Sequence, residues 1–258
     1  MDTTTTWRPP RFWRFLQVIA RGLVAVLARL RVTGDVPDGL RAGPLILAAN
    51  HISNFDPVVM AAATRVRRIV PRFMATGGLF RTPVVGAAMR ACGHIRVDRR
   101  TVNVARALDD AKAALADRSV VLLYPEGRIG LDPGVWPERG KTGAARMALA
   151  SGATVVPVAQ WGSHEVLPYV TNPRPVLRRI AHSLRHRPVV RVHFGPPVDL
   201  SGLHADVPGH AQRATERIID ALTESLRPLR LDEPDRPRYV DPTKPTSTDR
   251  AHRRSPTH

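Results

Sequence analysis

The sequence predicts an α/β fold, a single domain with a mostly parallel or mixed sheet flanked by helices, together with an N-terminal amphipathic membrane-interface helix. Short apolar runs at residues 44–49 (PLILAA) and 119–124 (SVVLLY) are typical of buried strands. Such runs alternate with segments of helical periodicity, for example residues 101–116. This alternation favours helices packed on the faces of one sheet. We expect the domain to span residues 32–231.

The other elements follow in chain order by the same criteria. Asp56 and Pro57 predict the start of a helix, with Asp at the N-cap and Pro in the first turn. That helix is expected to continue over residues 58–64. Further helices are expected at residues 77–91, 141–150 and 211–226, and further strands at residues 69–75, 93–97, 154–159 and 188–194. Residues 174–191 contain no acidic residue, which fits either contact with anionic headgroups or a solvated helix or hairpin face.

Residues 11–31 (RFWRFLQVIARGLVAVLARLR) predict the amphipathic helix, and we treat residues 1–31 as a membrane-associated segment. Arg14, Gln17, Arg21 and Arg29 fall roughly along one helical stripe, and apolar residues cover the rest of the helix. This pattern suits a helix in the interface plane of a bilayer, with arginines at the headgroups. The alternative is an ordinary helix that packs on the core.

The charge of the chain indicates a polyanionic partner. Lys and Arg number 39 against 22 Asp and Glu, a formal charge of +17. Residues 232–258 have no apolar periodicity, hold six basic and five acidic residues, and predict a disordered tail. Nearly all the charge therefore lies on residues 1–231. Nucleic acid is a remote alternative to a membrane surface, because zinc-ligand spacing and an aromatic strand signature are missing from the sequence.

A first candidate catalytic motif is N-H-I-S-N-F-D at residues 50–56, directly after a predicted buried strand. Open α/β sheets place their sites at strand ends. His51 and Asp56 can face each other across the turn, so that the carboxylate holds one ring nitrogen and the other accepts a proton from a substrate hydroxyl. Alternatively, Asp56 is only a helix N-cap.

Three further motifs follow strands or lie within them. Y-P-E-G-R at residues 124–128 combines a glycine, which lets a ligand approach the backbone, with an arginine fork suited to phosphate. The alternative for this motif is a solvated turn. G-H-I-R-V-D-R-R at residues 93–100 places arginines at a strand end, and V-V-P-V at residues 155–158 is a strand with an internal proline.

In this order the four motifs resemble those of the glycerolipid acyltransferases, the 1-acyl-sn-glycerol-3-phosphate (lysophosphatidate) acyltransferase family, over residues 44–200. NHISNFDP matches the family's H-x4-D block, and GHIRVDR matches G-x-I-x-x-x-R. YPEGR matches F-P-E-G-T-x-[ST], and TVVPVA matches V-x-P-x-x.

The resemblance implies an O-acyltransferase of phospholipid biosynthesis. A fatty acyl group would pass from acyl-CoA or acyl-carrier protein to the hydroxyl of 1-acyl-sn-glycerol 3-phosphate, giving phosphatidate, with no cofactor, metal or acyl-enzyme. Another acceptor, such as lyso-ornithine lipid, a lysophospholipid or glycerol 3-phosphate, is the alternative. The expected location is the cytoplasmic face of the cell membrane, as a peripheral or monotopic protein.

By the same resemblance, His51 would be the general base and Asp56 its orienting partner. Arg99 would bind the acceptor phosphate, and the Glu126–Gly127 turn would shape the same pocket, Glu126 orienting a hydroxyl or a basic side chain. The sequence departs from the family at Arg128, where Thr is usual, and at Gly130. A second basic cluster at residues 139–143 includes Lys141 and precedes a predicted helix, so Arg128 and Lys141 are further candidate substrate ligands.

Overall fold

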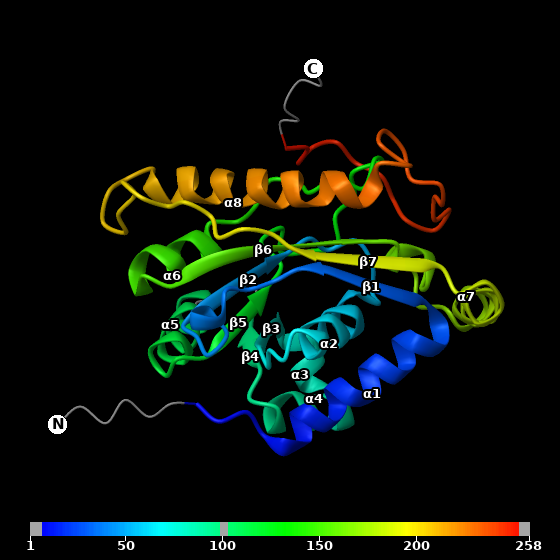
Figure 1. The fold of residues 1–258 in the computed structure, drawn as a ribbon, viewed down its shortest axis with the longest axis horizontal. Coiled ribbons are helices and arrows are strands. Elements are labelled where there is room, and N and C mark those ends of the chain that lie inside the picture. The colour runs from blue at the N-terminus through cyan, green and yellow to red at the C-terminus, as the bar shows by residue number, and fades with distance from the viewer. Residues whose placement is uncertain (1–6, 99–102, 253–258) are drawn as a thin grey trace.

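The computed structural model describes residues 7–98 and 103–252, and within α5 it leaves the side chains of residues 103–105 undescribed. Its centre is a seven-stranded sheet in the order β1-β7-β6-β2-β5-β3-β4 (Figure 1). The strands are β1 (Arg29–Gly34), β2 (Leu45–Ala49), β3 (Arg72–Thr76), β4 (Ile95–Val97), β5 (Val120–Leu123), β6 (Thr154–Trp161) and β7 (Val189–Phe194).

The sheet is mixed, which is one of the two forms, mostly parallel or mixed, that the sequence predicts. β4, β3, β5, β2 and β6 are mutually parallel, whereas β7 pairs antiparallel with β6 and parallel with β1. β2 lies between β5 and β6, and all of its residues are buried. The carboxyl ends of β5, β2 and β6 therefore lie side by side at one edge of the sheet.

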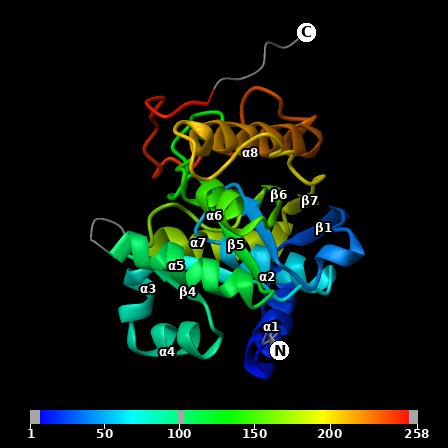
Figure 2. The same ribbon diagram turned by 90° about the vertical axis from the view of Figure 1, so that its left-hand side faces the viewer.

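Helices cover both faces of the sheet and bury two apolar cores (Figures 1 and 2). On one face lie α1 (Arg11–Leu27) and α2 (Asp56–Val66), and on the other α5 (Asn103–Ala116), α6 (Gly143–Ser151) and α8 (His210–Leu226). Residues 77–91, expected as one helix, form α3 (Gly77–Arg81) and α4 (Pro83–Ala91). The break is at Thr82, which is extended because a residue before proline disfavours the helical conformation.

The N-terminal helix differs from the prediction in length and in packing. It ends at Leu27, and residues 29–31, expected in the helix, begin β1 instead. Gln17, expected on a polar stripe, is fully buried and donates to the Thr64 hydroxyl and the Ile69 carbonyl, at 3.1 and 3.0 Å. Trp13 donates to the Pro71 carbonyl at 2.9 Å. The helix is thus a structural part of the domain rather than a separate segment.

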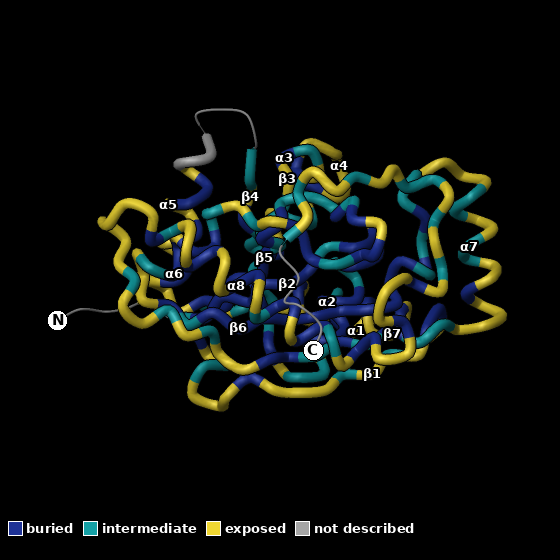
Figure 3. The backbone as a smooth tube through the Cα atoms, turned by 90° about the horizontal axis from the view of Figure 1, so that it is seen from above, coloured by how far each residue is buried: buried dark blue, intermediate teal, exposed yellow. Residues whose placement is uncertain are grey.

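A second face of α1 is apolar and exposed. Its exposed apolar residues are Phe12, Phe15, Val18, Ile19, Leu23 and Val26. Beside α1 lies α7 (Pro173–His186), which forms the basic segment predicted above as either a helix or a hairpin. Figure 3 shows α7 at one end of the molecule and exposed over most of its length. Within the described part of the chain, none of the helices has both the length and the hydropathy to cross a bilayer.

The C-terminal segment also departs from the expected disordered tail. After α8 and a short 3₁₀ helix, the described residues 232–252 run over the domain without regular secondary structure. Glu233 is buried and accepts from Trp161 Nε1 at 3.3 Å, and the Asp241 carboxylate accepts from the Tyr169 N–H. Specific polar contacts therefore hold a segment that has too few apolar residues to signal order by itself.

Candidate active site

Three adjacent strand ends bring the site together. His51 lies two residues beyond β2, Glu126 three residues beyond β5, and Ser163 two residues beyond β6. The first and third of these strand ends are joined by the Asn50 side chain, which exchanges hydrogen bonds with the Gln160 backbone at 2.8 and 3.0 Å. Parallel strands thus place residues that are far apart in the sequence at one edge of the sheet.

His51 and Asp56 form the predicted pair. His51 Nδ1 lies 2.8 Å from Asp56 Oδ2, and Asp56 is fully buried at the start of α2. The same oxygen accepts from the backbone N–H of Ile52 and Ser53, at 2.6 and 2.9 Å, and Oδ1 accepts from Ser163 Oγ at 2.6 Å. Four donors around this buried carboxylate fix its orientation. Asp56 therefore starts the helix and also orients His51.

The other side of the imidazole is available for a substrate. The ring of His51 stacks on Tyr124, with centroids 4.1 Å apart and planes inclined by 18°. Nε2 has no hydrogen-bond partner among the residues that the structure describes, and the side chain is 17% exposed. With Nδ1 donating to Asp56, the neutral ring carries its lone pair on Nε2. That nitrogen can accept a proton from a bound hydroxyl.

Glu126 is buried and accepts hydrogen bonds from two backbone N–H groups, rather than from the hydroxyl or basic side chain that the resemblance implies. Its Oε1 accepts from the His51 N–H at 2.9 Å, and its Oε2 accepts from the Glu138 N–H at 3.1 Å. Burial raises the pKa of Glu126 to about 8, against the lowering effect of these two hydrogen bonds. Glu126 thus ties the His51 loop to the loop between β5 and α6.

Two glycines allow this close packing. Gly127 has φ +72° in the turn after β5, a conformation that side chains other than glycine rarely adopt. Gly130, the departure noted above, donates its N–H to the His51 carbonyl at 2.8 Å. A Cβ at Gly130 would lie 2.8 Å from Glu126 Oε2, so a side chain there would displace the buried carboxyl group.

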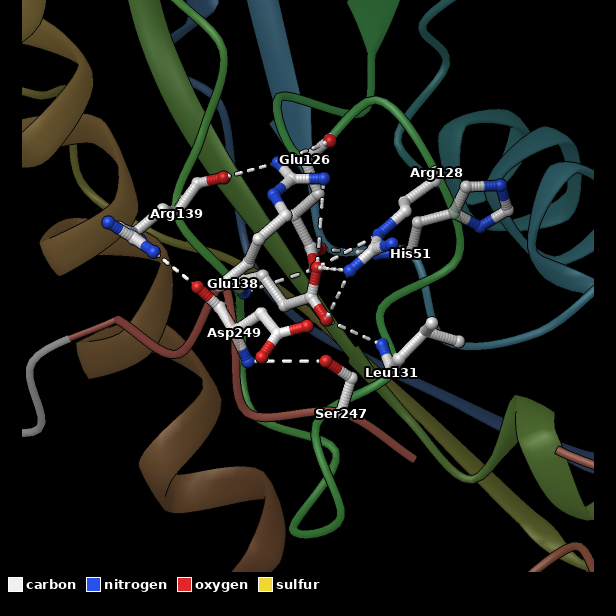
Figure 4. Close-up of polar contacts among 9 residues, drawn as sticks. His51, Glu126, Arg128, Leu131, Glu138, Arg139, Ser247 and Asp249 are labelled. Atoms are coloured by element: carbon white, nitrogen blue, oxygen red, sulfur yellow. Dashed lines mark hydrogen bonds and ion pairs between the residues drawn. The ribbon is translucent and has the colours of Figure 1, made fainter. Parts of the chain in front are cut away.

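Arg128 forms an ion pair within the site. Its guanidinium donates to both oxygens of the Glu138 carboxylate, with a shortest distance of 3.0 Å, and Glu138 also accepts from the Leu131 N–H at 2.7 Å (Figure 4). Glu138 is fully buried, whereas Arg128 is about one-third exposed. The positive charge of Arg128, which the sequence suggests as a phosphate ligand, is therefore partly balanced by Glu138, a residue outside the Y-P-E-G-R motif.

A cavity of about 630 Å³ opens beside Tyr124. The apolar side chains that line it include Met74, Leu108, Leu123 and Met147. Its basic side chains are Arg128, Lys141, Arg146 and Arg250. The apolar residues are the more buried set and the basic residues the more exposed one, so the cavity has an apolar interior and a positive mouth. That combination matches an amphiphile with an anionic headgroup.

The structure brings together His51, Asp56, Glu126, Gly127, Arg128 and Lys141. Lys141 packs its aliphatic chain against Gly127 and donates its backbone N–H to the Pro125 carbonyl at 2.8 Å. Arg99, the expected phosphate ligand, lies outside the described residues.

Sequence reasoning missed Ser163, Tyr124 as a stacking partner, and Glu138. Ser163 could have been found, because it follows the fourth motif's strand after a glycine. Glu138 lies in a loop without a recognisable pattern.

The fold resembles a solved structure of the same architecture. The crystal structure of the 1-acyl-sn-glycerophosphate (LPA) acyltransferase PlsC from Thermotoga maritima superposes with a TM-score of 0.60 at 19% identity, covering 82% of this chain and 78% of that one. At that identity the similarity supports the fold.

Curated relatives are similar over parts of the chain. An uncharacterised protein of Mycobacterium leprae (strain TN) is 25% identical over 215 residues, 71% of this chain and 56% of its own. The 1-acyl-sn-glycerol-3-phosphate acyltransferase of Streptococcus pneumoniae (strain ATCC BAA-255 / R6) is 27% identical over 199 residues, 74% of this chain and 65% of its own. A lyso-ornithine lipid O-acyltransferase of Rhizobium meliloti (strain 1021) is 30% identical over 119 residues, 46% of this chain and 36% of its own.

The chain thus spans 56–61% of the length of the mycobacterial relatives that it matches. The family model described as Acyltransferase matches residues 29–161, about half of the chain, from β1 through β6. That span contains the His51–Asp56 pair and the Glu126 turn, and the chain belongs to the acyltransferase family.

Proposed function

We propose that this protein transfers a fatty acyl group from acyl-CoA or acyl-carrier protein to the free hydroxyl of 1-acyl-sn-glycerol 3-phosphate. The observation that carries the proposal is the His51–Asp56 pair, in which a buried carboxylate holds one ring nitrogen and no described residue binds the other. It lies beside a cavity that combines an apolar interior with a basic mouth.

In the proposed reaction, His51 Nε2 accepts the hydroxyl proton as the oxygen attacks the thioester carbonyl. The new C–O bond forms and the C–S bond breaks. The thiolate of the donor then takes the proton from the imidazolium, so His51 returns to its neutral form. Asp56 stabilises the imidazolium through the contact at Nδ1, and Glu126 positions the backbone of His51. The cavity would hold the acceptor, with its phosphate near Arg128 and Lys141.

We also propose that the protein acts at an anionic membrane surface, docked through α1. The apolar side chains on the outer face of α1 support this, as does the basic helix α7 beside it. The cytoplasmic face of the cell membrane and a peripheral or monotopic attachment remain part of the proposal.

The test is an acyl-transfer assay with the purified protein, labelled acyl-CoA or acyl-carrier protein, and a panel of acceptors. The panel contains lysophosphatidate, lyso-ornithine lipid, a zwitterionic lysophospholipid and glycerol 3-phosphate. We expect the highest kcat/KM with lysophosphatidate and phosphatidate as the product in mass spectrometry. A higher kcat/KM with lyso-ornithine lipid would contradict lysophosphatidate as the preferred acceptor and would favour lyso-ornithine lipid, the acceptor in the name of the Rhizobium relative. Release of free fatty acid alone would contradict acyl transfer.

A further inference from the structure

The C-terminal segment, residues 232–252, lies against the loop that carries the Glu126 turn. Ser247 donates its N–H to the Leu131 carbonyl at 2.9 Å, and Arg139 donates its N–H to the Arg250 carbonyl at 2.8 Å. An isolated antiparallel bridge joins Glu138 to Ala251. Figure 4 shows Ser247 and Asp249 beside Leu131, Glu138 and Arg139. The loop between β5 and α6 is therefore held from outside by the last described part of the chain.

Arg250 makes the most direct of these contacts. Its Nη2 donates to the Glu126 carbonyl at 3.0 Å and to the Arg139 carbonyl at 2.6 Å. Its Nη1 lies 3.8 Å from Glu138 Oε2. The side chain is 25% exposed and lines the same cavity as Arg128 and Lys141. One guanidinium thus connects both ends of the loop and adds a positive charge to the cavity.

The contacts of Arg250 also change the balance between positive and negative charges in the site. Asp56, Glu126 and Glu138 are buried close to one another, and Arg128 is the arginine of the β5–α6 loop that pairs directly with Glu138. Arg250 places a second guanidinium near Glu138. A buried carboxylate costs free energy unless opposite charges or hydrogen-bond donors compensate it. Because Arg250 and Arg128 together compensate Glu138, the mouth of the cavity is more positive than Arg128 alone would make it.

Lys244 adds to the same balance. Its Nζ is buried and has no hydrogen-bond partner among the described residues. Burial lowers the pKa of Lys244, and the nearby Asp56 and Glu126 carboxyl groups oppose that change. The C-terminal segment therefore places two cations close enough to the buried carboxyl groups around His51 to interact with them electrostatically.

We propose that Arg250 is a positioning residue of the acyl-transfer site, which sets the affinity for a phosphate-bearing acceptor by fixing the loop of Arg128 and Lys141. This inference rests on the proposed function. Arg250 lies about 90 residues beyond the end of the matched family region, so the family match does not assign it a role. Of Glu126, Arg250 reaches only the backbone carbonyl, whereas the Asp56 carboxylate that orients His51 is held by Ile52, Ser53 and Ser163, which Arg250 does not contact. Its loss should therefore act on acceptor binding more than on the chemical step.

The experiment compares Arg250→Met with Arg236→Met in the full chain. Arg236 is an exposed arginine of the same segment that makes no contact with the site among the described residues, so its variant controls for lost charge. We expect Arg250→Met to raise the KM for lysophosphatidate about tenfold, the lower end expected for lost hydrogen bonds from a charged donor, while kcat changes less than about threefold. Arg250→Lys should give an intermediate KM, because an ammonium keeps the charge but not the planar fork.

Hydrogen exchange of the peptides covering residues 126–141 provides a readout that does not depend on activity. Arg250→Met should exchange faster there than the wild type, and Arg236→Met should not. If the wild type transfers no acyl group, the proposed function fails, and the exchange data still decide whether Arg250 braces the loop. Equal KM and equal exchange in the two Met variants would overturn the inference. If Arg250→Met does not fold, Arg250→Lys with wild-type KM and exchange would overturn it as well.

Discussion

At the scale of single residues, His51 and Asp56 have different tasks. Asp56 is buried and surrounded by four donors, whereas Nε2 of His51, which none of the described residues binds, is the atom that can meet a substrate. Asn at position 56 can keep most of this geometry. Its oxygen can accept the two backbone N–H groups, and its NH₂ group can donate to Ser163, whose hydroxyl both donates and accepts. The charge that stabilises the imidazolium would be lost.

We therefore expect His51→Ala to lower kcat by about 10²- to 10⁴-fold, the usual contribution of a general base. Asp56→Asn should cause a smaller loss, since the imidazole remains. The measurement is single-turnover acyl transfer, with thermal unfolding of each variant as the control for folding. Turnover of His51→Ala near that of the wild type would remove His51 from the mechanism.

Glu126 gives a second prediction at this scale, in the pH dependence of stability. Its pKa in the folded protein is about 8, above the ordinary value of 4.5, because burial disfavours the charged form. Between these two values the folded chain holds a proton that the unfolded chain has lost. The contribution of Glu126 to stability is therefore full below pH 4.5 and declines as the pH rises towards 8.

Glu126→Gln should remove this decline, because an amide does not titrate. The variant should also be less stable than the wild type at pH 5, because its NH₂ group would face the backbone N–H of His51 or of Glu138. Thermal unfolding of both proteins between pH 5 and pH 8 is the measurement. Parallel profiles across that range would show that Glu126 is ionised in the folded protein throughout.

At the scale of elements, α1 has two apolar faces with different roles. Trp13, Val24 and Leu27 are buried in the core, so removing the helix would expose that core. A loss of membrane binding after such a deletion could then not be distinguished from unfolding. Phe15 and Val26 are 59% and 55% exposed and can be changed without disturbing the core.

Phe15→Ser combined with Val26→Ser should weaken binding to anionic vesicles by about tenfold or more, since burial of one such side chain contributes roughly 1.5–3 kcal/mol. The unfolding temperature should stay near that of the wild type. The matched control is Leu231→Ser with Val240→Ser, two exposed apolar residues of the C-terminal region. Equal vesicle binding by the two double variants in a sedimentation assay would exclude the outer face of α1 as the docking surface.

At the scale of the whole molecule, the formal charge of +17 and the apolar face of α1 would act together on a membrane. Attraction between arginines and anionic headgroups is screened by salt, whereas insertion of apolar side chains is not. The two contributions can therefore be separated by ionic strength.

We expect vesicle binding to weaken but to persist when salt rises from about 0.1 M to about 1 M, where the screening length falls from about 10 to about 3 Å. Vesicles of zwitterionic lipid serve as the control and should show little change with salt. Complete release at high salt would contradict apolar insertion, and binding to anionic vesicles that is independent of salt would contradict the electrostatic part.

The sequence by itself determined the alternation of strands and helices and the His51–Asp56 pair, because both depend on residues close together in the chain. A run of apolar residues is enough to predict a buried strand. A histidine five residues before an aspartate at a helix start needs only a local turn to contact that aspartate. Where the prediction was wrong, the local pattern was ambiguous. Arg29 and Arg31 continue the helical pattern of α1, yet pairing with β7 places them in a strand.

Only the tertiary structure decided how the strand ends are joined and what surrounds Glu126. The contact between Asp56 and Ser163 spans 107 positions, and that between Arg250 and Glu126 spans 124. The buried face of α1 was likewise decided by Thr64 and Ile69, which accept from Gln17. Such contacts depend on which strands become neighbours, and the burial that sets the pKa of Glu126 exists only once the sheet and its loops have assembled.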